Sequence, residues 1–412
     1  MTKEPTAEEP RRDVSRRVFL GMAGVGAGTF VAGTATGAAV ASQNIQPADS
    51  LASGSVGSST VPFYGEHQAG IQTPFQSHGV FLGFNLAADA TRESAGRMMR
   101  LLTDDAARLT QGQPALPDND PYLATTPARL TVTFGFGPGF FSRLGLEGQI
   151  PDGFAPLPQF SIDALQPEYS GGDLLIQVGA DDPLTVSHAV RQLTRTARSF
   201  ADVQWSQSGF VRAQGAAPST ETPRNLFGQV DGTVNPRTDQ QFDAQVWAST
   251  GPAWFRGGTE MVLRRIAMNL DTWDKLDEGG KELSVGRKLS NGAPLTGKNE
   301  FDSPDFDAKT ATGLKVIPAF AHIRRARTED PQQKFLRRPL SYDDGITEGG
   351  TPDVGLLFAA YMANIEYQYV PVQQRLADLD LLNTWTTPIG SAVFALPPGC
   401  QPGGFIGEGL LT

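Results

Sequence analysis

The feature that most constrains the fold of this chain is an alternation of strands and helices that occurs twice. In the first copy, segments rich in β-branched and aromatic residues predict strands at 80–86, 130–136, 173–180 and 203–211. Segments with one apolar face predict helices at 91–108 and 183–196, the first capped by Asp89 or Thr91. The order strand, helix, strand, long loop, strand, helix, strand is that of a ferredoxin-like unit.

The second copy of the pattern is less regular. It predicts a strand at 258–269, a helix in the polar region after residue 271, a strand at 355–363, a helix at 371–382 and a loop-rich tail. Small and polar residues at 214–220 separate the two copies. We therefore expect an α+β chain with an N-terminal ferredoxin-like half over 61–214 and a C-terminal half over 221–412.

Residues 1–41 predict an export signal. Ser15-Arg16-Arg17-Val18-Phe19-Leu20 matches a twin-arginine motif, and a weakly apolar run rich in Gly, Ala and Thr follows it. Small residues at 39–41 suit cleavage before Ser42, and a flexible Ser/Gly/Gln-rich linker is expected over 42–60. Polar residues interrupt the apolar run, so no stable membrane anchor is expected.

This signal predicts a partner and a location. The chain would meet the twin-arginine translocation machinery, and the protein would work in a periplasm or outside the cell. Because that route exports folded proteins, it favours an enzyme that receives its cofactor before export.

Composition argues against several classes of protein. Net charge is −10, from 34 Lys and Arg against 44 Asp and Glu, which argues against a nucleic-acid binder. The single cysteine, Cys400, excludes an intramolecular disulfide and a cysteine zinc cluster. Any metal held by imidazole must use one of four histidines, namely His67, His78, His188 and His322.

One turn in the second half carries an acid. The segment 225–236 reads Asn-Leu-Phe-Gly-Gln-Val-Asp-Gly-Thr-Val-Asn-Pro, with Asp231 between Gly228 and Gly232. Asp-Gly is a common turn dipeptide, so one interpretation of Asp231 is a solvated hairpin corner. The other is an acid/base carboxylate held over a cofactor.

Four motifs together carry a resemblance to a known family. They are Tyr64-Gly65-x-His67-Gln68-Ala69-Gly70-Ile71, Gly228-x-x-Asp231-Gly232-Thr233 followed by Asn235-Pro236, Ala321-His322-Ile323-Arg324-Arg325-Ala326, and Leu336-Arg337-Arg338-x-x-Ser341-Tyr342. From about residue 62 onward the chain resembles the dye-decolourising peroxidases, a family of haem enzymes. Its signal is similar to that of the exported branch, which includes the deferrochelatase/peroxidases. The resemblance implies two ferredoxin-like halves packed sheet to sheet in a dimeric α/β-barrel-type fold, with one haem b in the C-terminal half.

The resemblance also implies site residues. His322 would be the proximal ligand of the haem iron, Asp231 the distal acid/base, and Arg337 the distal arginine beside the peroxide. The backbone at the haem edge would be that of Gly232, Thr233 and Val234.

The residue types support this site. His322 follows an apolar stretch at 316–320 and precedes a group of cations suited to haem propionates, of which Arg327 is one. A buried core histidine is the alternative for His322. Phe358 is expected to wall the pocket, with core packing as an equally good alternative. Asn364 stands where relatives often carry an acidic residue, so the sequence identifies no hydrogen-bond partner for His322.

The predicted activity is a haem peroxidase that uses hydrogen peroxide and an organic electron donor such as a dye or a phenol. A distal aspartate, with a reference pKa of about 3.9, remains a base in acid, which predicts optimum activity below neutral pH. Two alternatives stay open: a deferrochelatase that releases iron from haem, and a non-catalytic protein that binds or delivers haem. Oligomeric state is not predicted.

Overall fold

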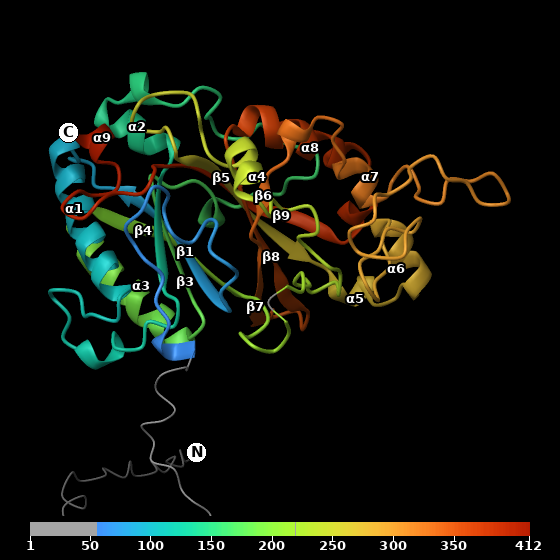
Figure 1. The fold of residues 1–412 in the computed structure, drawn as a ribbon, viewed down its shortest axis with the longest axis horizontal. Helices are drawn as coiled ribbons and strands as arrows, with labels where there is room; N and C mark the ends of the chain where they lie inside the picture. The colour runs from blue at the N-terminus through green and yellow to red at the C-terminus, as the bar shows by residue number, and fades with distance from the viewer. Residues whose placement is uncertain (1–55, 219) are drawn as a thin grey trace, which may run out of the picture. The chain divides into compact units, whose positions relative to one another are not determined.

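The structure is a computed structural model that describes residues 56–218 and 220–412. The first half contains β1 (His78–Leu86), α1 (Arg92–Leu109), β2 (Thr131–Phe136), α2 (Pro138–Leu144), β3 (Leu174–Ala180), α3 (Pro183–Ala197) and β4 (Ala201–Phe210). The second half contains α4 (Asp239–Gln245), β5 (Thr259–Met268), α5 (Leu270–Trp273), α6 (Glu278–Val285), α7 (His322–Ala326), β6 (Leu336–Arg337), β7 (Leu340–Ile346), β8 (Pro352–Met362), α8 (Ile365–Leu379), β9 (Thr386–Leu396) and α9 (Glu408–Leu411) (Figure 1).

The strands of the two halves join into a closed ring. Each half contributes antiparallel strands in ferredoxin-like order, β2-β3-β1-β4 in the first half and β7-β8-β5-β9 in the second. The two sheets meet at both edges, where Phe136 pairs with Ala395 and Phe210 pairs with Ser341. The predicted α+β fold with two ferredoxin-like halves is confirmed, and ring closure leaves these strands without a free edge.

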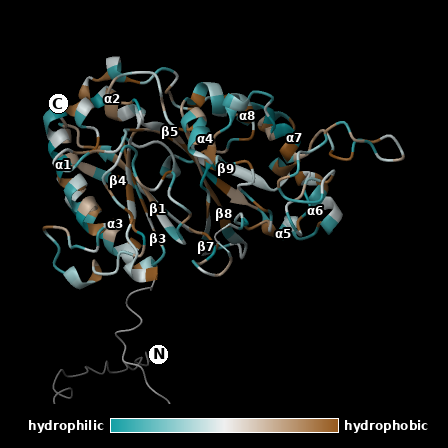
Figure 2. Cartoon of the chain, in the orientation of Figure 1, coloured by the Kyte–Doolittle hydropathy of each residue, from teal (hydrophilic) through white to brown (hydrophobic). Residues whose placement is uncertain are grey.

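Side-chain alternation along β5 separates the core of the ring from its outer surface. Met261 and Leu263 are buried in a core to which both sheets contribute. Ile266 and Met268 have the opposite parity, so they face the outer side of the same sheet, where α7 and α8 lie. Figure 2 shows hydrophobic residues along the strands and hydrophilic residues on the outer faces of α1 and α3.

A capping box explains where α1 begins. The Thr91 side chain accepts a hydrogen bond from the Ser94 backbone N–H at 3.1 Å, and the Ser94 hydroxyl accepts one from the Thr91 N–H at 2.9 Å. Of the two candidate caps, Thr91 is therefore the one used.

The prediction that the last helix begins at residue 371 was wrong. Helix α8 begins at Ile365 because the Asn364 side chain accepts a hydrogen bond from the Tyr367 N–H at 2.7 Å. Pro371 lies inside the helix and removes only one backbone donor.

The prediction of a loop-rich tail was also wrong. Strand β9 pairs with β5 along its length, from Thr386 opposite Met268 to Leu396 opposite Thr259. Pro388 weakens the strand pattern in the sequence, and it lies opposite Ile266, where the register shifts. A bulge in the sheet therefore accommodates the proline.

The N-terminal predictions lie largely outside the described residues. This holds for the whole twin-arginine signal at 1–41 and for the linker up to residue 55. At the end of the expected linker, Gly57 and Ser59 accept backbone hydrogen bonds from Ala128 and Arg129 at 2.9 and 2.7 Å. Within residues 56–218 and 220–412, no helix has both the length and the apolar content to cross a membrane.

Candidate active site

A cavity of about 320 Å³ lies on the outer side of the second sheet. Its walls come from the acid-bearing loop at 225–234, from α7 and α8, and from β5 and β8. Apolar side chains form much of its lining, among them Ile266, Met268, Val285, Leu356, Phe358 and Leu382. Ile162, from a loop of the first half, also reaches the cavity.

The acid-bearing loop folds back on itself as a tight hairpin. Arg224 pairs with Val230, and the Asp231 N–H donates to the Pro223 carbonyl at 2.8 Å. Gly232 has a φ of 136°, which favours glycine, and a Cβ atom there would lie 3.1 Å from Thr222 Cγ2. Glycine is therefore required by the turn itself. In the described residues, Gly232 is not part of the cavity wall, unlike its three neighbours Asp231, Thr233 and Val234.

Asp231 and Arg337 form an ion pair in the cavity wall. Arg337 Nη1 lies 2.9 Å from Asp231 Oδ1, and both side chains are partly buried. The Asn225 amide donates to Asp231 Oδ2 over a longer distance of 3.3 Å. The Asn235 amide donates to the Arg337 carbonyl at 2.7 Å and accepts from the Arg337 N–H at 3.0 Å. Asn225 therefore supports Asp231, and Asn235 supports Arg337.

Neither asparagine was assigned a role from the sequence. Both lie within the motif segment 225–236, and that position was the available signal. Their partners could not be identified in this way, because Asn235 contacts a residue 102 positions away.

His322 begins α7 and has a buried carboxylate as its partner. Its Nδ1 atom lies 2.5 Å from Asp380 Oδ2, and Asp380 Oδ1 accepts from the Leu382 N–H at 3.0 Å. The carboxylate fixes the proton on Nδ1 and leaves the Nε2 lone pair free. Burial alone would lower the pKa of His322, but the charge and hydrogen bond of Asp380 outweigh burial and leave this pKa raised.

The sequence identified no partner for His322, and Asn364, where relatives often carry an acidic residue, caps α8. Asp380 lies at the other end of α8, where its side chain also caps the following turn at Leu381–Thr384. It is 58 positions from His322, so no local pattern could indicate the contact.

The remaining predicted residues divide between the cavity and other parts of the fold. Arg327 and Phe358 line the cavity together with His322. His67 lies elsewhere, stacked on Trp247 with ring centroids 3.8 Å apart. His188 is a buried packing residue whose Nε2 lies 2.9 Å from an Asp118 oxygen.

The cavity wall carries more cations than carboxylates. Among the described residues, five cations line it, namely Arg264, Arg287, Arg327, Lys334 and Arg337, against the two carboxylates of Asp231 and Asp380. Arg264 pairs with Asp163 of the first half, yet its buried Nη1 atom has no hydrogen-bond partner among the described residues. An apolar cavity with excess positive charge suits a flat apolar ligand that carries carboxylates.

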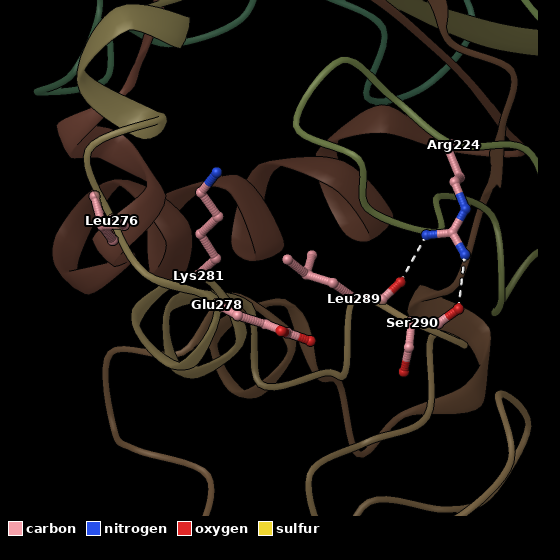
Figure 3. A pocket seen from close by; sticks show the side chains of 6 residues that line it. All are labelled: Arg224, Leu276, Glu278, Lys281, Leu289 and Ser290. Atoms are coloured by element: carbon pink, nitrogen blue, oxygen red, sulfur yellow. Dashed lines mark hydrogen bonds between the residues drawn. The ribbon is translucent and has the colours of Figure 1, made fainter.

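A second hollow beside α6 has different chemistry. It is lined by Arg224, Leu276, Glu278, Lys281, Leu289 and Ser290 (Figure 3). Arg224 is engaged there in hydrogen bonds to the carbonyls of Leu289 and Ser290, at 2.7 and 3.0 Å. None of the described residues that line this hollow is a histidine, so the candidate active site is the cavity around His322.

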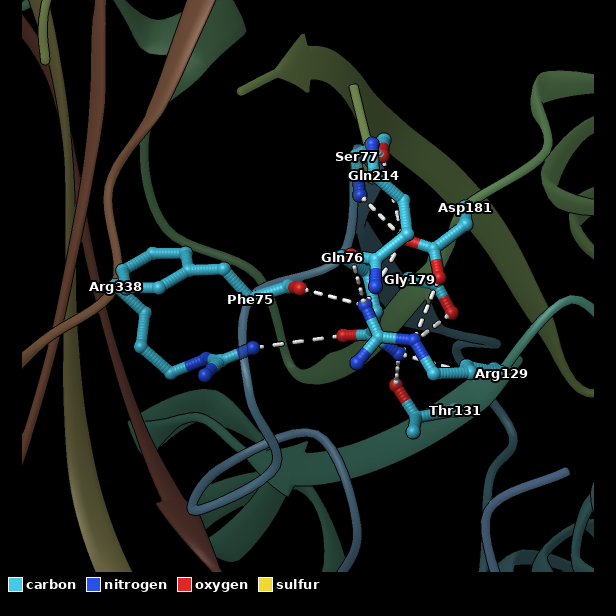
Figure 4. Close-up of polar contacts among 9 residues, drawn as sticks. All are labelled: Phe75, Gln76, Ser77, Arg129, Thr131, Gly179, Asp181, Gln214 and Arg338. Atoms are coloured by element: carbon cyan, nitrogen blue, oxygen red, sulfur yellow. Dashed lines mark hydrogen bonds and ion pairs between the residues drawn. The ribbon is translucent and has the colours of Figure 1, made fainter. Parts of the chain in front are cut away.

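Adjacent arginines point to opposite sides of the second sheet. Arg337 faces the cavity, whereas Arg338 donates to the carbonyl of Thr73. Arg338 also donates to Gln76 Oε1 at 3.4 Å (Figure 4). Burial lowers the pKa of Arg338 to about 10. The double arginine therefore has one residue at the candidate site and one that links the two halves.

Family models match most of the described chain. A model described as "Dyp-type peroxidase, N-terminal" covers residues 68–211, and one described as "Dyp-type peroxidase, C-terminal" covers residues 222–401. The chain belongs to the Dyp-type peroxidase family. The family and the enzyme class predicted from the motifs are confirmed.

Individual members of the Dyp-type peroxidase family show the same relationship. A dye-decolorizing peroxidase of Thermobifida fusca is 38% identical over 84% of this chain and 83% of its own length. A deferrochelatase of Escherichia coli K12 is 35% identical over 85% of this chain and 87% of its own. The crystal structure of a DyP-type peroxidase from Cellulomonas bogoriensis is 48% identical, with a TM-score of 0.85 over 87% of this chain and 99% of that one.

Proposed function

We propose that this chain is a haem-dependent peroxidase that uses hydrogen peroxide to oxidise an organic reductant such as a phenol or a dye. The observation that carries the proposal is one cavity lined by a carboxylate-supported imidazole, His322, and by the ion pair of Asp231 and Arg337. Both members of the ion pair act electrostatically on His322, so the three groups share one site.

The lining of the cavity fits haem b. His322 Nε2 would bind the iron, because Nδ1 is engaged by Asp380. Phe358 and the other apolar lining residues would contact the macrocycle, with Thr233 and Val234 at its edge. Arg327, which has no carboxylate partner among the described residues, would face a propionate. When bound, haem supplies the iron at which peroxide is reduced.

Asp231 would move the proton that peroxide cleavage requires. Its carboxylate takes a proton from one peroxide oxygen and returns it to the other. Oδ1 is engaged by Arg337, so Oδ2, with its longer contact to Asn225, is the oxygen available for the proton. The guanidinium of Arg337 stabilises negative charge on the departing oxygen.

Iron release from haem is the second candidate function. It is supported by relatives named deferrochelatase, which are 35–36% identical to this chain over most of its length. The same cavity would hold haem, and iron-free porphyrin would be the product. A non-catalytic haem carrier would not need the Asp231–Arg337 pair.

We also propose export through the twin-arginine pathway to the periplasm or the cell exterior. The support is the motif that contains Arg16 and Arg17. Replacing both by Lys and following the protein in cell fractions tests this. Unchanged export would exclude the pathway.

One experiment tests the main proposal. The protein made with ample haem is purified, and its visible spectrum is recorded before and after addition of peroxide and a phenolic reductant. A Soret band and turnover of the reductant are expected. Absence of the band would exclude a haem enzyme, and release of iron-free porphyrin in place of turnover would favour the deferrochelatase.

A further inference from the structure

Glu300 lies behind the acid-bearing loop and connects to the cavity through a hydroxyl. Its Oε1 atom accepts hydrogen bonds from the hydroxyls of Thr222 and Thr233, at 2.6 and 3.0 Å. Thr233 lines the cavity, whereas Glu300 and Thr222 do not. Glu300 is partly exposed and Thr222 is buried. The Thr233 hydroxyl therefore stands between the cavity and a carboxyl group that water can reach.

A hydroxyl in this position can pass a proton. Thr233 donates to Glu300, and its oxygen retains acceptor capacity for a donor in the cavity. When the carboxyl group is protonated, the direction of this hydrogen bond can reverse. Asp231 has no comparable contact, because its described partners are Arg337 and the Asn225 amide.

The reaction needs protons that Asp231 does not supply. Reducing hydrogen peroxide to two water molecules takes up two electrons and two protons. Asp231 moves a proton from one peroxide oxygen to the other and ends with the charge it started with. A reductant that gives only electrons, such as ferrocyanide, leaves both protons to be drawn from solvent.

We propose that Glu300 and Thr233 form a relay that carries solvent protons into the distal side of the cavity. The carboxyl group of Glu300 gives its proton to the Thr233 oxygen, while the hydroxyl proton of Thr233 passes to the peroxide oxygen that lost its own proton to Asp231. That oxygen takes up two solvent protons and two electrons from the reductant and leaves as the second water, so the relay works twice in each turnover. Water at the exposed side then protonates the carboxylate again. This inference rests on the proposed peroxidase function and names the proton source of that same site.

The charges around Glu300 suit this role. Arg287 donates through Nη1 to the backbone carbonyls of Gly292 and Glu300, at 2.6 and 2.9 Å. Burial and the charge of Arg337 lower the pKa of Arg287, and the charge of Glu300 raises it. The cavity wall also contains Arg287, Arg337 and Asp231. A proton delivered by Thr233 therefore reaches a wall that carries both positive and negative side chains.

Three substitutions distinguish proton transfer through Glu300 from a purely structural role of this residue. Glu300→Gln keeps an oxygen that can accept from both hydroxyls but cannot take up a proton. Thr233→Val removes the hydroxyl on the cavity side. Thr222→Val is the matched control, because it removes the other hydrogen bond to the same Glu300 oxygen without touching the cavity wall.

The assay uses the haem-loaded enzyme with excess peroxide and ferrocyanide, in light and heavy water. We expect Glu300→Gln and Thr233→Val to lower kcat about tenfold, a modest share of what proton transfer contributes to catalysis, and to raise the solvent isotope effect. Their kcat/KM for peroxide and their Soret bands should stay close to the parent, and Thr233→Ser should recover most of the lost rate. Thr222→Val should stay within about twofold of the parent, as for an ordinary buried hydrogen bond remote from the chemistry.

Other outcomes would overturn the relay. One is a Glu300→Gln variant with parental kcat, and another is an equal loss of kcat in Thr222→Val and Thr233→Val. A third is loss of the Soret band in Glu300→Gln or Thr233→Val. Each of these results would mean that the carboxyl group only stabilises the loop. A parent protein without a Soret band or peroxide turnover would refute the proposed function instead.

Discussion

Asp380 Oδ2 lies 2.5 Å from His322 Nδ1 and joins the end of α8 to the start of α7. A carboxylate on the outer nitrogen makes an imidazole more basic and fixes its orientation. It thereby sets the electron-donating power of the proposed iron ligand.

Asp380→Asn should raise the reduction potential of the bound iron and speed the loss of haem to an acceptor protein. Mutating the hydrogen-bond partner of a metal-binding histidine typically lowers metal affinity or activity by about 10- to 100-fold. Spectroelectrochemistry and haem-transfer rates measure the two effects. Asp378→Asn is the control, because Asp378 is exposed on α8 and bonds only to Gln374 among the described residues. A potential equal to that of the parent would show that Asp380 does not tune the ligand.

Asp231→Asn should lower kcat/KM for peroxide by about 100- to 10,000-fold, the usual contribution of a positioned acid/base. Haem content should remain unchanged, since the amide has the same shape and can still accept from Arg337. Stopped-flow mixing with peroxide is the measurement, and Asp243→Asn on the exposed face of α4 is the control. Retained peroxide turnover would remove Asp231 from the mechanism.

Asn235→Ala should disturb Arg337 without touching its side chain. The change removes both hydrogen bonds to the Arg337 backbone, which are 2.7 and 3.0 Å long. We expect a loss of about 1–3 kcal/mol in stability and roughly tenfold in kcat/KM for peroxide. Asn235→Asp keeps the acceptor for the Arg337 N–H and should lose less. Denaturant unfolding and peroxide kinetics test this, and parental values for the Ala variant would contradict the bracing role.

Arg327→Leu should weaken haem binding by about 1–3 kcal/mol if the guanidinium faces a propionate. The difference between the variant and the parent should vanish with the dimethyl ester of haem, which has no charged propionates. Haem titration followed at the Soret band measures both. An equal loss with haem and with its ester would mean that Arg327 acts by packing.

The buried carboxyl group of Glu260 should make the stability of the fold depend on pH. Its side chain is fully buried on β5, Oε2 accepts from the Ile365 N–H at 2.5 Å, and Oε1 has no partner in the described part of the chain. Burial raises the pKa of Glu260 to about 8. Because the folded state holds this proton more tightly than the unfolded chain, the associated stability is complete below about pH 4.5 and is lost as pH rises towards 8.

Glu260→Gln should remove this dependence. The variant should gain about 3–5 kcal/mol over the parent at pH 8 and little at pH 4.5, the gain being the free energy that corresponds to the shift. Urea unfolding at several pH values is the measurement. A constant difference between the two proteins across that range would contradict the raised pKa.

Local patterns were enough for the four strands and the two long helices of the first half of the fold. The strands β1 to β4 and the helices α1 and α3 follow from side-chain periodicity and caps, because each depends on neighbours in the sequence. Strand β9 was missed, since Pro388 obscures its pattern and only its pairing with β5 makes it a strand. The start of α8 was missed because Pro371 suggests a helix boundary that the Asn364 cap overrides.

The sequence by itself determined the family, the two-fold strand and helix pattern, and the residues whose types suit peroxide chemistry. Only the tertiary structure decided which groups hold them: Asp380 for His322, Asn235 for Arg337, and Glu300 behind Thr233. These contacts join segments 58, 102 and 67 positions apart. A hydrogen bond depends on distance and direction in space, and chain order constrains neither over such separations.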